Sequence, residues 1–282
     1  MPNPVADMFR QAAQRLLDDD RRLGNVVQLA APCEAVISGD LHGNRAALDK
    51  IIRYAALGRS PATVLILQEL IHGPPDERSG KDRSIELLVR AARLYVQNPR
   101  QVLFLMGNHD LAQATGGEIV KSGGSVCKEF VEGVRFCFAE DAPEVLEAAC
   151  QFLLCLPLAV RCPEGLWVSH SLPTPARMTP QVMEVLHRPL EEADLRRGGG
   201  AYEWTWGRAQ TPEQIDQLAA ELGVEFFLLG HRHSEDGFEV LSPRCLTITS
   251  DGAAGCVVRV PCDRPLTSGS VTQYIKPLVT LG

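Results

Sequence analysis

Short apolar runs that end in histidine, aspartate or asparagine recur along this chain, and this pattern limits the folds open to it. An apolar run bounded by glycine or polar residues is typical of a buried strand. A polar group that follows such a run lies at a strand end, and neighbouring strands can bring several such groups to one edge of a sheet. The runs lead into four motifs: Asp40-Leu41-His42, Asn108-His109-Asp110, His170 and His231-Arg232-His233.

The N-terminal part of the chain alternates between expected strands and helices. Asn44 is a suitable N-cap for a helix that ends near Gly58. Because strand, helix and strand follow one another at short spacing, parallel strands in an α/β fold are favoured. The expected elements here are a helix over 5–23, strands over 34–38, 63–67 and 101–106, a helix over 44–58, a polar loop over 72–82 and a helix after that loop.

The C-terminal part contains more expected strands. The predicted strands are 166–169, 226–229, 246–248 and 256–260, and the predicted helices are 144–154, 181–187 and 212–222. The ligand-type motifs fall in both parts and must meet to form one site, so a single domain is favoured. We expect an N-terminal helical extension over residues 1–33 and one domain over residues 34–282.

Composition excludes several classes of protein. Hydrophobic residues make up 45% of the 282 residues and charged residues 22%, which is ordinary for a soluble globular chain. The net charge of −7 gives no general affinity for nucleic acid or for an anionic membrane. No apolar run reaches the ~18 residues of a membrane span, and the N-terminus has no secretory pattern. The nine cysteines form no CxxC pair, so reduced thiols in a cytoplasmic protein are expected.

The residue types at the strand ends are those that bind transition metals. Asp40 and His42, two positions apart, can point their side chains to the same side of a turn. The amide oxygen of Asn108 is a further potential ligand, which would leave His109 free as a general acid. Each motif alone also fits a polar turn or a hydrogen-bonded core histidine, and the joint occurrence is what favours a metal site.

The motifs together resemble the calcineurin-like metallophosphoesterase superfamily, most closely its bacterial and phage phosphoprotein phosphatases. The resemblance covers residues 34–252 and includes Trp206-Gly207-Arg208, where the family arginine binds substrate phosphate. It implies a four-layer α/β/β/α sandwich in which helices flank two mixed sheets. It also implies two divalent metal ions, manganese, iron or zinc. One metal would be held by Asp40, His42 and His233, and the other by Asn108, His170 and His231.

Three positions after the second strand depart from the family pattern. Glu69 stands where a bridging aspartate is expected, His72 where an aspartate supports the catalytic histidine, and Gly73 where an arginine binds phosphate. Asp110, next to His109, is a candidate to replace the supporting aspartate. Arg208 is the main candidate to neutralise phosphate, with Asn44 and His72 also expected near the substrate. Weaker candidates for phosphate binding are Arg45, Arg78 and Arg177.

The implied activity is hydrolysis of a phosphoester by a water that two metals activate, with His109 protonating the leaving group. The first hypothesis is a phosphomonoesterase like the serine/threonine protein phosphatases. An alternative is a hydrolase of dinucleoside polyphosphates or phosphodiesters. A third is a catalytically impaired regulatory or binding protein, because three expected groups change together. The expected partner is a phosphorylated protein or small molecule, with neither nucleic acid nor membrane involved, and the oligomeric state stays open.

Overall fold

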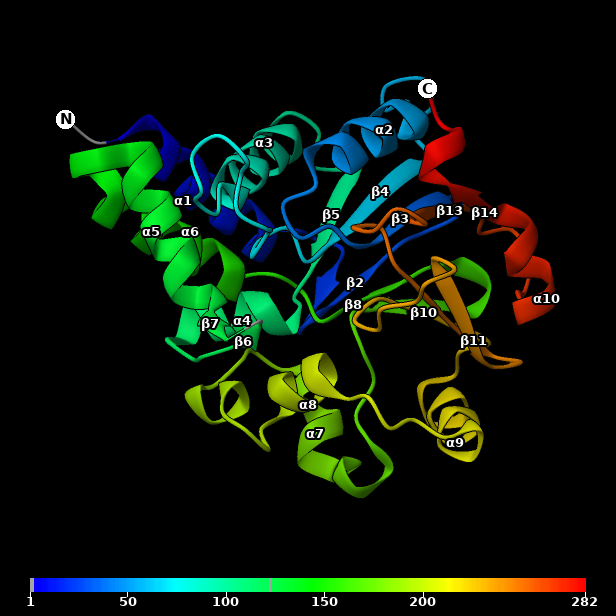
Figure 1. Cartoon of the computed structure of the whole chain (residues 1–282). Coiled ribbons are helices and arrows are strands. Elements are labelled where there is room, and N and C mark those ends of the chain that lie inside the picture. Colours follow the sequence, from blue (N-terminus) through cyan, green and yellow to red (C-terminus); the bar gives the residue numbers. More distant parts are fainter. Residues whose placement is uncertain (1–2, 122) are drawn as a thin grey trace.

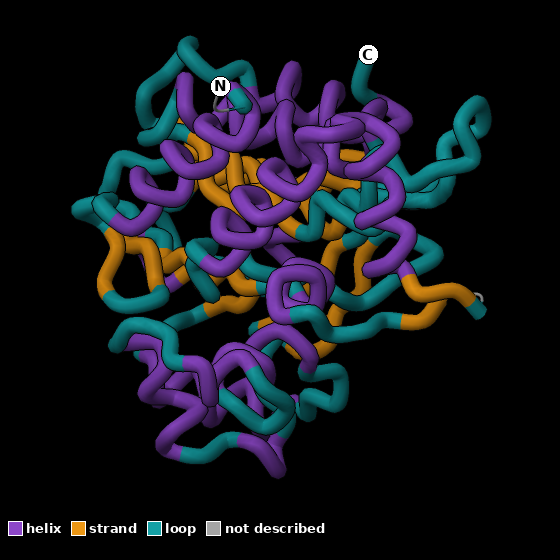
Figure 2. The backbone as a smooth tube through the Cα atoms, turned by 90° about the vertical axis from the view of Figure 1, so that its left-hand side faces the viewer, coloured by secondary structure: helices purple, strands orange, loops and turns teal. Residues whose placement is uncertain are grey.

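Two β-sheets lie face to face in the computed structural model, with helices on both outer sides (Figure 1). The structure describes residues 3–121 and 123–282. In Figure 2 the strands form the middle of the molecule, with helices above and below them. This is the four-layer arrangement of mixed sheets and helices that the sequence resemblance implies, so that expectation is confirmed.

The first sheet has the order β14-β13-β3-β4-β5. Its strands are β3 (Glu34–Asp40), β4 (Thr63–Gln68), β5 (Val102–Leu105), β13 (Cys256–Pro261) and β14 (Ile275–Pro277). As predicted, β3, β4 and β5 run parallel, while β13 and β14 pair antiparallel. Strand β3 continues two residues past the expected end at residue 38, which makes Asp40 its last residue.

The second sheet has the order β1-β2-β8-β9-β10-β12-β11. Its strands are β1 (Arg22–Leu23), β2 (Val26–Gln28), β8 (Ala159–Arg161), β9 (Leu166–Ser169), β10 (Phe226–Leu229), β11 (Phe238–Ser242) and β12 (Cys245–Ile248). Strands β9, β10 and β12 are parallel neighbours, so their carboxyl ends meet at one edge. A separate hairpin consists of β6 (Val120–Lys121) and β7 (Gly124–Ser125).

Successive side chains of a strand point to opposite faces of its sheet, so one set packs between the two sheets and the other packs against the helices. In β4, Val64 and Ile66 face the core between the sheets, whereas Leu65 and Leu67 face the helices. In β9 of the other sheet, Val168 faces inward. Because both faces of each central strand are covered, these strands are continuously apolar and carry no polar alternation.

The helices cover the outer faces of the sheets. Trp204 packs against Trp167 of β9 with ring centroids 5.9 Å apart, which holds a helix on the second sheet. The helices are α1 (Pro4–Leu17), α2 (Arg45–Ala55), α3 (Ser84–Gln97), α4 (Asn108–Thr115), α5 (Val126–Phe138), α6 (Ala142–Leu154), α7 (Pro180–Glu184), α8 (Gly200–Trp206), α9 (Pro212–Leu222) and α10 (Ser268–Val271). Figure 1 shows α2 and α3 over the first sheet and α7, α8 and α9 below the second.

Several helix boundaries differ from the prediction, and two of them are the ends of α1 and α2. The first helix ends at Leu17, and residues Arg22–Leu23, expected to be helical, form strand β1. The aspartates that follow Leu17 favour a turn, because their side chains bond to nearby backbone and side-chain groups. Helix α2 begins at the Asn44 cap as predicted but ends with Ala56 in the left-handed conformation, before Gly58.

The N-terminal segment contributes to one outer helical layer and to the second sheet. Phe9 of α1 lies 5.7 Å from Phe152 of α6 between ring centroids, and β2 pairs with β8 in the second sheet. The segment before residue 33 thus supplies strands as well as a helix, and the expected boundary at residue 33 stays a prediction.

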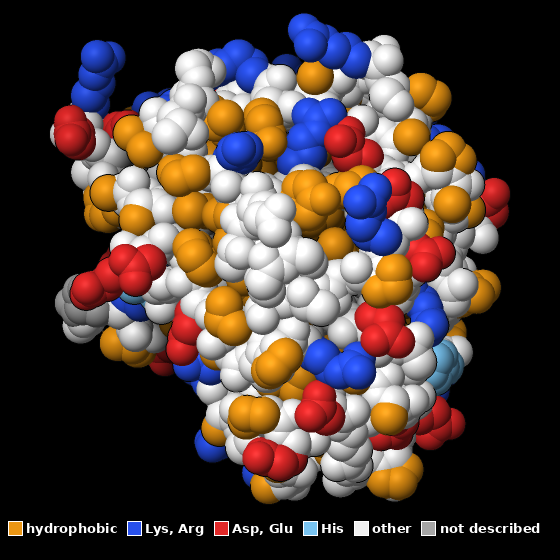
Figure 3. Space-filling model, turned by 90° about the vertical axis from the view of Figure 1, so that its right-hand side faces the viewer, with side chains coloured by type: hydrophobic (Ala, Val, Ile, Leu, Met, Phe, Trp, Pro, Cys, Tyr) orange, Lys and Arg blue, Asp and Glu red, His pale blue; other side chains and the backbone are white. Residues whose placement is uncertain are grey.

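In the described part of the chain, no helix combines the length and apolarity needed to cross a bilayer. On the face drawn in Figure 3, acidic and basic side chains are interspersed.

Candidate metal centre

The polar motifs meet where the carboxyl ends of both sheets come together. Asp40 ends β3 and forms an isolated bridge to Thr249, which follows β12 of the other sheet. The Asp40 carboxylate accepts a hydrogen bond of 3.0 Å from the backbone N–H of His231, which follows β10. Strand ends from both sheets are therefore joined at the point where the predicted ligands lie.

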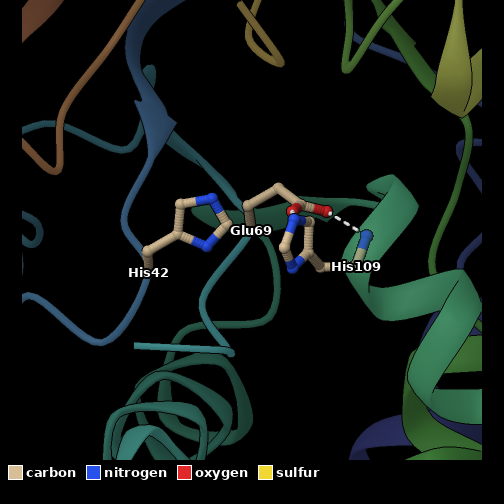
Figure 4. Close-up of side chains that lie close together, drawn as sticks. All are labelled: His42, Glu69 and His109. Atoms are coloured by element: carbon tan, nitrogen blue, oxygen red, sulfur yellow. Dashed lines mark hydrogen bonds and ion pairs between the residues drawn. The ribbon is translucent and has the colours of Figure 1, made fainter. Parts of the chain in front are cut away.

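Glu69 lies at the centre of this cluster and is only 1% exposed. Two sets of ligand atoms surround it, one with His42 and His109 and one with Asp40 and His170, and within each set all ligand atoms lie within 4.8 Å of one another. Figure 4 shows the rings of His42 and His109 beside the Glu69 carboxylate, which accepts a 3.0 Å hydrogen bond from the backbone N–H of His109. The bridging position expected for Glu69 is thus compatible with its placement between two sets of donors.

Two glycines have no side chain at the places where the carboxylates of Glu69 and Asp40 lie. A Cβ atom at position 107 would overlap Glu69 Oε1, so only glycine fits there. A Cβ atom at position 230 would lie 2.6 Å from Asp40 Oδ1. The glycines that precede Asn108 and His231 in sequence therefore allow these carboxylates to reach the centre.

The turns that carry the site have strained backbone. His42, Glu69, His72 and His231 have positive φ angles of 39°, 43°, 61° and 67°, a region that non-glycine residues rarely adopt. Backbone hydrogen bonds from Leu41 and His42 to the Glu69 carbonyl, of 3.0 and 2.8 Å, tie two of these turns together. Strain of this kind is typical of positions where side chains are held for function.

Several buried donor and acceptor atoms in the cluster have no hydrogen-bond partner. They are Glu69 Oε2, His170 Nδ1 and His231 Nε2. Buried polar atoms almost always have a partner, so several unpartnered oxygen and nitrogen atoms in one cluster of side chains indicate a cation. His170 Nδ1 lies 3.6 Å from Asp40 Oδ1, and His170 Nε2 lies 3.0 Å from Asn108 Oδ1. This donor set fits divalent transition metals, which prefer imidazole and carboxylate ligands.

Burial controls the charge of these groups. It raises the pKa of Glu69 well above its usual value, with the Asp110 and Asp40 carboxylates adding to the effect. It lowers the pKa of His231 to about 3 and that of His170 well below its usual range, with neighbouring cationic groups adding to both shifts. The rings of His170 and His231 are therefore neutral, which is the state in which an imidazole binds metal.

His109 is held by a second histidine. Its Nδ1 lies 2.8 Å from Nδ1 of His72, and Nε2 of His72 donates to Gln113 Oε1 at 2.8 Å. Burial lowers the pKa of His72 to about 4, so this ring is neutral and has one N–H. Because that N–H points to Gln113, Nδ1 of His72 is an acceptor and the Nδ1–H of His109 donates to it. His72 thus accepts the hydrogen bond that an aspartate was expected to accept.

The side chain of Asp110, the predicted substitute for that aspartate, points elsewhere. Its carboxylate accepts a 2.9 Å hydrogen bond from the backbone N–H of Gly107 and caps helix α4. Gln113 was missed in the sequence, although its position four residues after His109 on one helix places the two side chains on the same face.

A cavity of about 240 Å³ opens above the cluster. Some of its lining residues were not among the candidates named from the sequence: the cations Lys121 and Arg232 and the polar residues Thr249 and Asp251. Thr249 and Asp251 follow strand β12 and could have been found by the same strand-end pattern. Predicted residues that line it are Asp40, His42, Asn108, His109, Arg208, His231 and His233. His233 is exposed and lies outside both ligand sets around Glu69.

Backbone packing explains why no arginine stands at position 73. A Cβ atom there would lie 2.8 Å from the carbonyl oxygen of His42 and 3.0 Å from Gly43 Cα. Asn44, expected near substrate, uses its side-chain oxygen to cap α2 at Ala47 N and lines a neighbouring groove. A cation for substrate phosphate must therefore come from another segment.

The weaker arginine candidates do not line the cavity. Arg45 and Arg177 form ion pairs with Glu86 and Glu203, respectively, and Arg78 lies on the exposed loop before α3. Arg208 does line it, together with Lys121.

Comparisons with known proteins agree with this geometry. The family model for calcineurin-like phosphoesterases matches residues 35–235. A protein serine/threonine phosphatase from Saccharomyces cerevisiae, similar to human PP5, has 15% identity and a TM-score of 0.71, with 96% of this chain and 87% of that chain covered. A cold-active protein-tyrosine phosphatase of a psychrophilic Shewanella species has 12% identity and a TM-score of 0.60, covering 92% and 83%. At these identities the likeness concerns the fold alone.

No curated protein matches this sequence. The family match nonetheless covers well over half of the chain, and both solved neighbours share its fold. The chain therefore belongs to the calcineurin-like phosphoesterases, a family of metal-dependent phosphoric ester hydrolases.

Proposed function

We propose that this chain is a two-metal phosphomonoesterase of the serine/threonine protein phosphatase type. The observation that carries the proposal is that Glu69, His170 and His231, neighbouring side chains of one buried cluster, each have a buried polar atom without a hydrogen-bond partner. These atoms come from residues that are distant in sequence and share no hydrophobic role. Their common property is that each can bind a cation.

The family resemblance implies two cations with Glu69 between them. Asp40, His42 and the exposed His233 would hold one cation, and Asn108, His170 and His231 the other, a grouping that differs from the two sets of neighbouring ligand atoms around Glu69. When bound, two divalent cations lower the pKa of water and stabilise negative charge on a phosphoryl group. The neutral rings of His170 and His231 supply lone pairs, and the carboxyl groups of Asp40 and Glu69 offset part of the added charge.

His109 is the proposed general acid. Its Nδ1–H is held by His72, so the ring orientation is set and Nε2 is left for the proton that goes to the leaving oxygen. The neutral ring of His72 accepts this hydrogen bond through Nδ1, where the family has a carboxylate. Gln113 accepts from Nε2–H of His72 and so keeps the proton of that ring on Nε2. His72 is thus a proposed positioning residue, and it keeps the hydrogen bond that orients the His109 ring despite the altered sequence.

Cationic side chains at the rim would bind the substrate phosphate. Arg208, Lys121 and Arg232 all line the cavity, and they come from three different segments of the chain. Arginine can bind two phosphate oxygens through its planar fork, while lysine acts as a point charge. Together they replace the arginine that Gly73 cannot carry.

Grooves beside the cavity favour a substrate larger than a bare phosphate. One groove of about 780 Å³ shares His42 and Asp251 with the site and extends to Pro74 and Arg45. A second of about 550 Å³ shares the same two residues and extends to the β6–β7 hairpin. A phosphorylated peptide segment fits such flanking grooves, which supports a phosphoprotein substrate.

A substrate panel with Mn²⁺ tests this function. The purified protein should carry about two ions per chain by elemental analysis. It should hydrolyse an aryl phosphate and phosphopeptides, and a chelator should abolish both activities. His170→Ala should lose activity, whereas His187→Ala, at an exposed histidine outside the site, should not. Cleavage of dinucleoside polyphosphates without any phosphomonoester hydrolysis would refute the proposal, as would chelator-resistant turnover.

A further inference from the structure

Three cysteines from separate segments meet at the end of the sandwich opposite the metal centre. Cys33 directly precedes β3, Cys262 directly follows β13, and Cys162 directly follows β8. All three belong to the hydrophobic core between the two sheets. Strand β3 starts beside Cys33 and ends at Asp40, so roughly 20 Å of extended strand separates this thiol cluster from the metal centre.

Strand pairing places Cys33 and Cys262 opposite each other. The register of β3 and β13 pairs Glu34 with Pro261, and the next pair outward is Cys33 with Cys262. The backbone N–H of Cys262 donates to the Cys33 carbonyl at 2.9 Å, which continues the ladder. Directly opposed residues of a hydrogen-bonded antiparallel pair have Cα atoms about 5.5 Å apart, within the range that a disulfide spans.

Alternation along the strands directs the three thiols to one place. Cys33 has the same parity as Ala35 and Ile37, and Cys262 the same parity as Val258 and Val260, which all face the core between the sheets. Cys162 enters that core from the second sheet, two residues after inward-facing Val160. The cluster therefore joins both sheets at this end.

The three thiols differ in exposure and in charge. Cys162 and Cys262 are 3% and 1% exposed, whereas Cys33 is partly exposed and follows the exposed residues 30–32. Hydrogen bonds from the Cys162 and Cys262 thiols lower the pKa of Cys33 to about 4, against the opposing effect of burial. A reactive, reachable thiolate with two thiols beside it is the arrangement of a redox-active cysteine and its resolving partners.

We propose that Cys33, Cys162 and Cys262 form a thiol–disulfide exchange site. The Cys33 thiolate attacks one sulfur of a small disulfide, the S–S bond of that molecule breaks, and one thiolate leaves. A neighbouring thiol, Cys262 or Cys162, gives its proton to that leaving thiolate and attacks Cys33 Sγ, releasing the second thiolate. Two protein thiols are oxidised, and one small disulfide is reduced to two thiols.

Oxidised glutathione is the probe for this site. Fully reduced protein should lose two of its nine thiols in preference to the rest, and peptide mapping should find Cys33 joined to Cys262 or to Cys162. Cys33→Ser should prevent this loss. The matched control is Cys137→Ser, another partly buried cysteine, which lies on α5 and should oxidise like the parent.

A second set of variants keeps the test independent of folding defects. When Cys162 and Cys262 are both replaced by alanine, Cys33 has no resolving thiol and should accumulate as a mixed disulfide with glutathione, visible by intact mass. Thermal melts establish that each variant is folded. Equal oxidation of the parent and Cys33→Ser, or bridges that omit Cys33, would overturn the proposal. Phosphatase activity is not part of the readout, so failure here leaves the proposed function untouched.

Discussion

Glu69 is the single residue on which the proposed metal centre depends most. Its side chain is buried between the two ligand sets, one carboxylate oxygen accepts the His109 N–H, and the other has no partner. Its backbone adopts a φ of 43°, which costs a glutamate more than an aspartate. Glutamate at this position therefore combines backbone strain with a longer reach than the family aspartate has.

Replacing Glu69 tests its role directly. Glu69→Asp should retain activity and about two bound ions, because a carboxylate remains and the backbone tolerates aspartate. Glu69→Ala should lose about 10²-fold or more in kcat, since the charge between the ligand sets disappears. Elemental analysis and steady-state hydrolysis of an aryl phosphate measure both effects. If Glu69→Ala keeps the parent's activity and metal content, the glutamate is not a ligand.

His72 gives a second prediction at the scale of one residue. Removing its ring in His72→Ala leaves the Nδ1–H of His109 without its acceptor. We expect kcat to fall roughly 10- to 100-fold, less than the about 10²–10⁴ that a whole general acid contributes. Metal content should be unchanged, because His72 contributes no atom to the ligand sets.

Aspartate should restore what alanine removes. In His72→Asp a carboxylate can accept the same hydrogen bond, so kcat should return to the parent's level or exceed it. An equal loss of activity in the alanine and aspartate variants would show that the imidazole has some other role.

At the scale of elements, helix α4 brings several functional groups together. Its first turn presents Asn108 and His109, Gln113 in its second turn holds His72, and Asp110 caps the helix's own N-terminus. The helix follows directly from β5, so a strand end and a helix start coincide at the metal centre. This juxtaposition explains why a short helix carries so many buried polar residues.

The β6–β7 hairpin is the element that we propose supplies a cation in place of the missing arginine. It carries Lys121, which lines the cavity. Lys121→Gln should raise the KM for an aryl phosphate about three- to tenfold with a smaller change in kcat, because a phosphate-binding charge is removed. The matched control is Lys128→Gln on α5, where the exposed lysine pairs with Glu118. Equal KM values in the two variants would remove Lys121 from substrate binding.

At the scale of the whole molecule, the proposed ligands connect the two sheets. Asp40 ends a strand of the first sheet, and Glu69 and Asn108 follow strands of that sheet, while His170 and His231 follow strands of the second. Bound cations would therefore cross-link the sandwich at this edge. Any ion that binds only the folded state stabilises it by mass action, by ~2.7 kcal/mol at a hundred times Kd.

Metal removal should thus lower thermal stability. Adding Mn²⁺ to stripped protein should raise the Tm by about 5–10 °C for a chain of this size. His170→Ala, which removes a ligand from the second sheet, should reduce this shift, whereas His187→Ala should preserve it. Melting curves with and without Mn²⁺ measure the effect. A Tm that does not respond to the ion would contradict a cross-linking metal centre.

Much of the local structure follows from the sequence. The strand limits 166–169 and 226–229 were predicted as they stand, because both ends are marked by polar groups or glycine. The N-terminal helix was predicted too long, because the prediction extended to Leu23 across the five charged residues 18–22. Helix α5 was not predicted, although Ser125 caps it.

Sequence alone determined which polar residues stand at strand ends, because strand limits depend on neighbouring residues and on the burial pattern. Only the tertiary structure decided which of those residues meet. It placed His72 and Gln113 behind His109, turned Asp110 away to cap α4, and brought Lys121 to the cavity. Contacts of this kind depend on sheet order, turn conformation and the packing of distant segments, and local sequence patterns contain no information about separations in space.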